Sequence, residues 1–340
     1  MTRLSIKDAH ILLGKAFAAQ GVSPQNAEPT IKALIAAECD GQKGHGLMRV
    51  PSYLAQVKSG KINGKSTARI TNTPDPNRGY GQTLRIDAGH GFAYPALELA
   101  RREGIRLARQ KGISCVTIYN SHHFGQGAYH VEPIAHAGLI ALLLGNSPKA
   151  IGFWGSATPA MGTNPIVFAA PIPNAPPLVI DLALAVGARG KVVAAQNAGK
   201  SIPEGWSLGP DGEPTTDPQT ALQGSMLPIG RAKGAALALM VEVMAAALSG
   251  GQFGYEASSL FSADGPPPSL GQTLILIDPD PLSGGHFGQR MTDMAREIEQ
   301  TEGARLPGQS RLVHRKQAAL GGINIADALY ADITALGREV

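Results

Sequence analysis

Residues 115–125 of the chain read Cys-Val-Thr-Ile-Tyr-Asn-Ser-His-His-Phe-Gly, an apolar run that ends in polar groups. Val, Thr, Ile and Tyr favour extended backbone, so residues 115–119 are predicted to form a buried strand. Enzymes built on α/β sheets place polar, reactive groups at the ends of such strands. His122 and His123 stand at that point, and imidazole titrates near physiological pH. The pattern therefore favours His123 as a site residue.

Other short apolar runs extend this pattern along the chain. They predict strands at 139–144, 166–169, 178–182 and 274–277. Apolar positions with helical spacing predict helices at 94–111, 128–138, 184–197, 230–249 and 287–301. Strands interspersed with helices indicate an α/β sheet with helices around it. The Gly- and Pro-rich segment Asn197–Pro228 is predicted to be one long ordered loop that covers the site.

The N-terminal 40 residues have the signals of two helices. Ser5 is a candidate N-cap for the first helix, which Gly21 would end. Ser23 and Pro24 fit the start of the second helix, and Gly41 fits its end.

Composition limits the class of protein. Of 340 residues, 43% are hydrophobic and 16% charged, with a net charge of +4, which excludes a disordered chain. No stretch approaches the ~20 apolar residues of a membrane span, and the N-terminus lacks an apolar signal core. Two cysteines, Cys39 and Cys115, fit a reducing cytoplasm. No run of five basic residues occurs, so neither nucleic acid nor membrane is expected as a partner.

Several common motifs are absent or out of context. No strand is followed by G-x-G-x-x-G, so an ordinary Rossmann fingerprint is missing. The segment 194–201 (AAQNAGKS) resembles a phosphate loop, but it follows a predicted helix, for which Gly199 is a better C-cap. The segment 205–209 (GWSLG) matches a nucleophile pattern but lies between two prolines. The clustered histidines lack the spacing of zinc ligands, so no metal is predicted.

Three further residues have the chemistry of a carboxylate-binding site. His45 lies between Gly44 and Gly46, where backbone and ligand can approach closely, and Arg49 follows on the next turn. A guanidinium can bind a carboxylate through two hydrogen bonds. Asp181 lies within an apolar strand, where a carboxylate needs a partner. That partner would be a histidine or an arginine of the site, and a structural ion pair with Arg189 is the alternative.

Taken in order, these motifs resemble the malate/L-lactate dehydrogenase family of NAD(P)-dependent oxidoreductases. The matching stretches are Asp40-Gly-Gln-Lys-Gly-His45-Gly-x-x-Arg49, Asn120-Ser-His-His-Phe-Gly125, Gly162-Thr-Asn-Pro165 and Ile180-Asp181. The resemblance runs from about residue 5 to 335 and implies a non-Rossmann α/β fold. It implies an NAD(P)-binding sheet lobe (116–299) and a mainly helical substrate lobe built from both termini (1–115 with 300–340).

The resemblance also implies roles for individual residues. His45 would donate a proton, Asp181 would orient it, and Arg49 and His123 would bind a small-molecule carboxylate substrate. NADPH is the expected cofactor, with NADH as the alternative, in a cytoplasmic homodimer. Its expected contacts are His123, Phe124, Gly125, Thr163, Asn164, Lys233, Arg305, Gly308 and Arg311.

Two local features bear on the reaction. The stretch 40–47 (DGQKGHGL) and Val131-Glu-Pro133 are similar to the branch that reduces Δ1-pyrroline-2-carboxylate and Δ1-piperideine-2-carboxylate to L-proline and L-pipecolate. Open-chain 2-oxo or 2-hydroxy acids are the alternative substrates. Members of the family commonly have serine before the histidine, where this chain has Gly44. A third possibility is therefore a nucleotide-binding homologue with an impaired proton relay.

Overall fold

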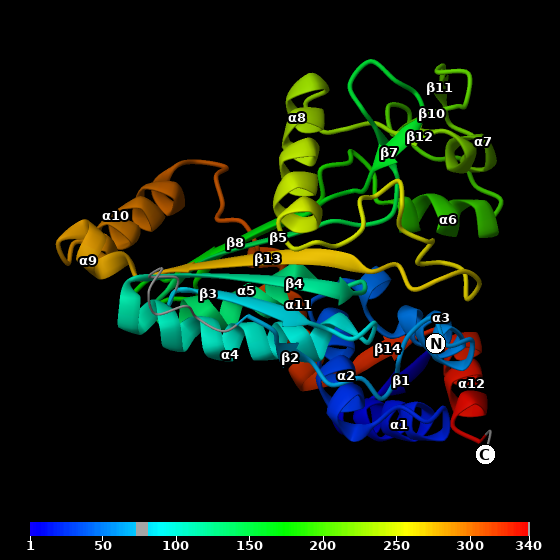
Figure 1. The fold of residues 1–340 in the computed structure, drawn as a ribbon, viewed down its shortest axis with the longest axis horizontal. Helices are drawn as coiled ribbons and strands as arrows, with labels where there is room; N and C mark the ends of the chain where they lie inside the picture. Colours follow the sequence, from blue (N-terminus) through cyan, green and yellow to red (C-terminus); the bar gives the residue numbers. More distant parts are fainter. Residues whose placement is uncertain (73–80, 339–340) are drawn as a thin grey trace.

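A seven-stranded sheet forms the centre of the computed structural model, which describes residues 1–72 and 81–338 (Figure 1). In spatial order its strands are β2 (Arg69–Ile70), β3 (Thr83–Asp87), β4 (Ile113–Ser121), β13 (Leu270–Ile277), β5 (Ile140–Gly145), β8 (Ile166–Ala170) and β9 (Leu178–Leu182). β3 and β4 run parallel, and the other neighbouring pairs are antiparallel. A Rossmann sheet is mostly parallel, which explains why its glycine fingerprint is missing.

Helices cover both faces of this sheet. On one face lie α4 (Ala93–Lys111) and α5 (Gly127–His136), whose small residues pack against the strands. The other face carries α8 (Ala232–Val241), which continues into a π-helical stretch, η3 (Glu242–Ala247) (Figure 1). The prediction of an α/β sheet surrounded by helices is confirmed.

The segment 197–228 does not form the single loop that its composition predicts. It contains β10 (Ser207–Leu208), β11 (Pro214–Thr215), α7 (Pro218–Gln223) and β12 (Ser225–Met226). β12 pairs with β6 (Ile151–Gly152), which pairs with β7 (Pro159–Met161), and these strands make a five-stranded sheet. Strands of two residues are too short to show an alternating pattern, so no sequence pattern predicts them.

Predicted element boundaries are close to the observed ones elsewhere. Two starts differ by more than two residues. α6 (Arg189–Asn197) begins five residues after its predicted start at 184, because Ala185 forms a β-bridge with Pro228, and β13 begins four residues before its predicted start at 274. Gly199, with φ of 59°, stands just beyond the end of that helix, as expected of a C-terminal glycine.

Segments from the two ends of the chain form one helical layer (Figure 1). Its elements are β1 (Thr2–Leu4), α1 (Ile6–Ala19), α2 (Pro24–Cys39), α3 (Val50–Lys58), α11 (Gln309–Gly321), β14 (Ile323–Ile325) and α12 (Asp327–Leu336). β1 pairs antiparallel with β14, and Phe17 shares a core with Ile333. Ser5 caps α1 as predicted, since its hydroxyl accepts the Asp8 N–H at 3.0 Å. The exact limits of the two lobes remain predictions.

Two further helices, α9 (Pro279–Ser283) and α10 (Phe287–Gln300), reach beyond the end of the sheet (Figure 1). Across residues 1–72 and 81–338, none of the helices combines the length and apolar character that crossing a bilayer requires.

A buried ion network ties the C-terminal α11 to the rest of the fold. Arg315 donates two hydrogen bonds to Asp40, at 2.8 and 2.9 Å, and two to Glu132, at 3.0 and 2.9 Å. Asp40 ends α2 and begins the segment that leads to His45. The side chains of Asp40 and Glu132 are 2% and 8% exposed, so their charges depend on this partner.

We expect Arg315→Met to lower the free energy of unfolding by about 3 kcal/mol, because it leaves two buried carboxylates without their main cation. Chemical denaturation monitored by circular dichroism would measure this. Arg296→Met is the matched control, since Arg296 forms an exposed pair with Asp293 at 3.5 Å and should cost less than about 0.5 kcal/mol. Equal losses in the two variants would contradict the assignment.

Candidate active site

A short irregular segment between α2 and α3 carries His45 and Arg49. Two single turns, η1 (Lys43–His45) and η2 (Leu47–Arg49), meet at Gly46. The Glu38 carboxylate accepts the Leu47 N–H at 2.8 Å and lies so close to Gly46 that a Cβ there would collide with it. Glycine at position 46 is therefore required for this segment to lie against α2.

His45 and His123 come together although they are far apart in the sequence. Their rings stack with centroids 5.3 Å apart and planes inclined by 17°. His123 follows the end of β4, as the sequence predicted. Burial, together with the positive charge of Arg49, lowers the pKa of His45 to about 4. The same two causes hold the pKa of His123 well below its ordinary value, so both rings are neutral at pH 7.

Arg49 lies beside this histidine pair with its guanidinium held in place. Its Nε donates to the Gly44 carbonyl at 2.8 Å, and the Phe261 ring lies over it, 5.1 Å from the ring centroid to Cζ. Its Nη2 lies 3.9 Å from where a Cβ on Gly190 would be, at the start of α6. Within residues 1–72 and 81–338 no acidic side chain pairs with Arg49. Its terminal nitrogens are thus free to bind an anion.

The hydrogen-bond partner of Asp181 is a backbone N–H, and not the histidine or arginine side chain that the sequence predicted. It stands on β9, the edge strand of the sheet, and desolvation of its carboxylate raises the pKa of that group above its ordinary value. Its carboxylate accepts the Ala128 N–H at 2.8 Å, at the first turn of α5. The structural alternative is wrong, because Arg189 donates to the Leu222 carbonyl at 3.1 Å and forms no ion pair with Asp181.

No described residue hydrogen-bonds the Nδ1 of His45, although this nitrogen is buried. Asp181 therefore does not contact His45 in this conformation, and its orienting role remains a prediction.

Of the predicted cofactor residues, Thr163 and Asn164 lie at a junction of three segments. The Thr163 carbonyl accepts the Leu184 N–H at 2.7 Å, and the Leu184 carbonyl accepts the Ile229 N–H at 2.9 Å, four residues before Lys233. Asn164 is fully buried, with its amide donating to the Ala238 carbonyl and to Glu242, both at 2.9 Å. These hydrogen bonds hold Asn164, and with it the neighbouring Thr163, in a fixed position.

The remaining predicted cofactor residues lie in two places, Phe124 and Gly125 just beyond β4 and Gly308 and Arg311 at the start of α11. Phe124 is buried, and Gly125 has φ of 68° with the Tyr94 hydroxyl directly against it, so a side chain at 125 would be displaced. Gly308 begins α11 next to the Val179 carbonyl, two residues from Asp181. Arg311 is 7% exposed, and its guanidinium lies 3.7 Å from Asp40 and 3.8 Å from Glu132.

The donor set fits a phosphate-bearing cofactor. Lys233 and Arg305 are exposed, and neither pairs with an acidic side chain in the described parts of the chain. The Ser147 hydroxyl accepts the Thr163 N–H at 3.0 Å, which places two hydroxyl groups beside the same turn. Among residues 1–72 and 81–338 no group of three potential metal ligands occurs.

Sequence reasoning missed Glu242, which accepts four hydrogen bonds. They come from the backbone of Gly162 and Gly254, both at 3.2 Å, and from the side chains of Asn146 and Asn164, at 3.3 and 2.9 Å. The π-helical turn begins at this residue, and such turns are frequent at functional sites. The sequence signal for Glu242 was that it is the one acidic residue in the helix predicted at 230–249.

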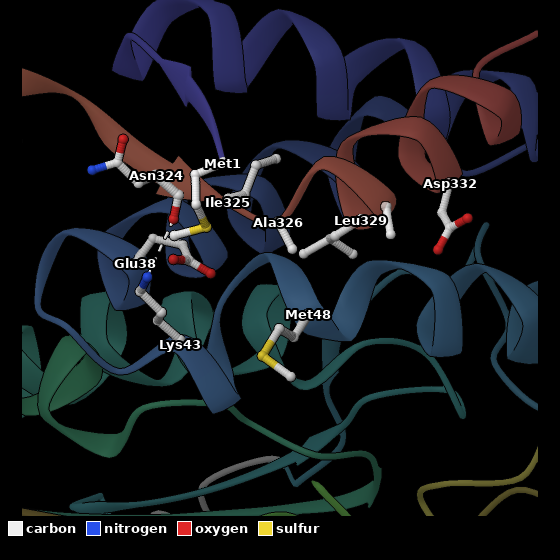
Figure 2. A pocket seen from close by; sticks show the side chains of 10 residues that line it. Met1, Glu38, Lys43, Met48, Asn324, Ile325, Ala326, Leu329 and Asp332 are labelled. Atoms are coloured by element: carbon white, nitrogen blue, oxygen red, sulfur yellow. Dashed lines mark hydrogen bonds between the residues drawn. The ribbon is translucent and has the colours of Figure 1, made fainter. Parts of the chain in front are cut away.

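A pocket of about 390 Å³ lies between the segment around Lys43 and Met48 and the C-terminal residues 324–332 (Figure 2). Glu38, Lys43 and Met48 form one wall, and Asn324 and Leu329 contribute to the other. None of the predicted site residues lines it. This pocket is therefore separate from the predicted site residues.

Comparison with known proteins was consistent with this geometry. The profile of the family described as malate/L-lactate dehydrogenase matches residues 4–334. The (2R)-3-sulfolactate dehydrogenase (NADP(+)) of Chromohalobacter salexigens is 45% identical over 92% of each chain. The Δ1-pyrroline-2-carboxylate/Δ1-piperideine-2-carboxylate reductase of Pseudomonas syringae pv. tomato is 38% identical over 93% of this chain and 91% of that one. The crystal structure of the Δ1-piperideine-2-carboxylate reductase from the same organism superposes with a TM-score of 0.91, covering 99% of this chain and 100% of that one.

Proposed function

The chain belongs to the malate/L-lactate dehydrogenase family of NAD(P)-dependent oxidoreductases, and from that premise we propose that it reduces the C=N bond of cyclic imine 2-carboxylates with NADPH. The products would be L-proline and L-pipecolate. The observation that carries the proposal is the neutral His45 beside an arginine without an acidic partner. The similarity to reductases named for these substrates supports it.

The chain's own residues would perform the binding and the proton transfer. NADPH, when bound, supplies the hydride that C2 receives. Arg49 would hold the substrate carboxylate through its terminal nitrogens, which fixes C2 near the histidine pair. His45 would deliver the proton to the nitrogen as it gains electron density. Thr163, Lys233 and Arg305 would hold the phosphates and ribose.

Substrate binding would also prepare His45 for its role. The pKa of His45 is near 4 partly because Arg49 is positively charged. A bound carboxylate neutralises that charge and adds a negative one, and an opposite charge raises the pKa of a histidine. We therefore expect His45 to take up its proton when the anionic substrate binds.

A specific observation favours a second candidate, the oxidation and reduction of a dianionic 2-hydroxy or 2-oxo acid such as 3-sulfolactate. Arg189 lies next to Gly190, which borders the Arg49 guanidinium, and its Nη1 is buried without a hydrogen-bond partner in the described chain. A second cation there would suit a second negative group. A relative of 45% identity carries the sulfolactate name.

An NADPH-oxidation assay separates the two candidates. Δ1-pyrroline-2-carboxylate, Δ1-piperideine-2-carboxylate, 3-sulfopyruvate, oxaloacetate and pyruvate would be compared by kcat/KM, with NADH in parallel. The proposal expects the cyclic imines to exceed every open-chain acid. A higher kcat/KM for 3-sulfopyruvate that falls selectively in Arg189→Met would establish the second candidate instead.

We propose that the chain forms a homodimer and acts in the cytoplasm. Apolar side chains that α8 and η3 expose support the homodimer. Leu239, Met240 and Val243 are 49%, 42% and 53% exposed, and neighbouring exposed apolar side chains often mark a protein–protein interface. Light scattering coupled to gel filtration should give twice the mass of 35.3 kDa. A monomer at micromolar concentration would contradict the proposal.

Gly44→Ser tests whether the relay lacks a hydroxyl group. Nothing lies within 4 Å of a Cβ built at Gly44, so serine fits without strain. We expect kcat to rise about two- to tenfold, because the hydroxyl gives the unpartnered Nδ1 of His45 a hydrogen bond. Gly14→Ser is the matched control, as its site is equally open. An unchanged or lowered kcat in Gly44→Ser would show that the chain works without that hydroxyl.

A further inference from the structure

We propose that Tyr53, backed by Tyr94, fixes the tautomer of His123 so that this ring offers a hydrogen-bond donor, Nε2–H, to the bound reactants. Tyr53 is then a positioning residue that acts through His123. The inference deepens the proposed function and rests on it for the identity of the reactants. The tautomer itself is a property of the protein without substrate.

A short chain of hydrogen bonds carries the proposal. The Tyr53 hydroxyl lies 2.6 Å from Nδ1 of His123 and 3.1 Å from the Tyr94 hydroxyl. Tyr53 and Tyr94 are 1% and 2% exposed, so water does not replace these contacts. His123 is half-buried at the end of this chain, with its ring stacked on His45.

The direction of the hydrogen bonds follows from counting protons. Burial raises the pKa of both phenols, so each hydroxyl keeps its proton at neutral pH. In the described chain, the Tyr94 hydroxyl has the Tyr53 oxygen as its one hydrogen-bond partner. If Tyr94 donates to Tyr53, and Tyr53 to His123, every proton has an acceptor. The reverse direction leaves the Tyr94 proton buried without an acceptor, which is strongly disfavoured.

The protonation state of His123 completes the argument. A neutral imidazole carries one N–H, and burial keeps His123 neutral. Because Nδ1 accepts from Tyr53, the proton is on Nε2, which is hydrogen-bonded to no residue of the described chain. Nε2–H can donate to an oxygen of the substrate carboxylate or of the nicotinamide amide. His123 thereby binds and orients, while proton transfer stays with His45.

The surroundings of Tyr53 restrict its ring, so the hydroxyl keeps its position. The ring packs edge-on against Phe92, with centroids 5.5 Å apart and planes at 62°, and against His122, with centroids 5.9 Å apart. Tyr53→Phe therefore removes one hydroxyl from a site where the ring itself still fits. Tyr129→Phe is the matched control, because Tyr129 is half-buried and packs edge-on against His130, 5.3 Å away.

The tautomer can be observed directly in protein labelled with ¹⁵N-histidine, by two-bond proton–nitrogen correlation, with His123→Asn to assign the signal. We expect a pyridine-like Nδ1 and a pyrrole-like Nε2 for His123 in the wild type and in Tyr129→Phe. In Tyr53→Phe we expect a mixture of tautomers and a fall of about tenfold in kcat/KM on the imine substrate. Tyr94→Phe should change the tautomer less, since Tyr53 can still donate.

Two results would overturn the proposal. One is a pyrrole-like Nδ1 in the wild type, which would mean that His123 donates to Tyr53. The other is a Tyr53→Phe variant with the wild-type tautomer and wild-type kcat/KM, which would make Tyr53 a packing residue. If the enzyme proves to act on another substrate, the spectrum of the free protein still decides the tautomer, so the two failures are distinguishable.

Discussion

Replacing His45 by asparagine is expected to lower kcat for imine reduction by about a hundredfold to ten-thousandfold, the range that a positioned proton donor contributes. His45 stacks on His123 and lies close to Arg49, which pairs with no acidic side chain in residues 1–72 and 81–338. Asparagine keeps a polar group of similar reach but has no proton to transfer. Steady-state NADPH oxidation at pH 7 measures the change, and the Kd for NADPH, from fluorescence titration, should stay within about threefold.

The control for this variant is His286→Asn, which changes an exposed histidine at the start of α10. It should leave kcat unchanged. If His45→Asn retained more than about a third of the wild-type kcat, the proton would have to come from another group or from solvent, and the assignment would fail.

The pH dependence supplies a second test of the same residue. The pKa of His45 is about 4 in the free protein, and bound carboxylate should raise it. Reduction needs the protonated form, so kcat should fall as pH rises through the pKa of the complex, which lies above that of the free enzyme. Binding of an unreactive 2-carboxylate should tighten as pH falls, because binding takes up a proton. Neither trend should survive in His45→Asn.

Much of the framework could be predicted because it depends on local sequence. The strand predicted at 115–119 contains the continuous run Val-Thr-Ile-Tyr, and the observed strand extends it by two residues at each end. The helix caps at Ser5 and Gly199 each need a single residue type. The pairing of β13 between β4 and β5 was not predictable in this way. It joins residues 270–277 to segments more than 100 positions earlier, and no local signal encodes such a contact.

The site was predicted as residue types and not as an arrangement. His45, Arg49 and His123 were recognised because each combines reactive chemistry with glycine or strand-end context. Tyr53 was not, since a tyrosine within an apolar helix is typical of core packing. Its function depends on a hydroxyl that meets His123 from another segment. The partner of Asp181 was not predicted either, because its carboxylate accepts a backbone N–H from α5, a segment more than 50 positions earlier in the chain.

Arg49→Lys is expected to raise KM for the carboxylate substrate by about ten- to a hundredfold, with a smaller change in kcat. The loss is that of a charge-assisted, two-pronged hydrogen bond, worth about 1.5–3 kcal/mol. Lysine keeps the charge but cannot reproduce the fork, nor the contact from Nε to the Gly44 carbonyl. The ratio of KM to kcat effects, measured with Δ1-pyrroline-2-carboxylate, distinguishes binding from catalysis. Arg296→Lys, on the exposed face of α10, is the matched control.

Arg49→Met separates the two roles that the structure gives this arginine, because it removes the charge as well as the fork. Arg49 lowers the pKa of His45, so its removal should raise that pKa above about 4, while Arg49→Lys should leave it nearly unchanged. An NMR titration of the His45 ring in the two variants measures the difference. If methionine left the pKa of His45 where it was, burial alone would account for it, and substrate binding could not prime the proton donor through Arg49. In that event the carboxylate would still bind at Arg49, but the proton that reaches the imine would have to be supplied independently of it.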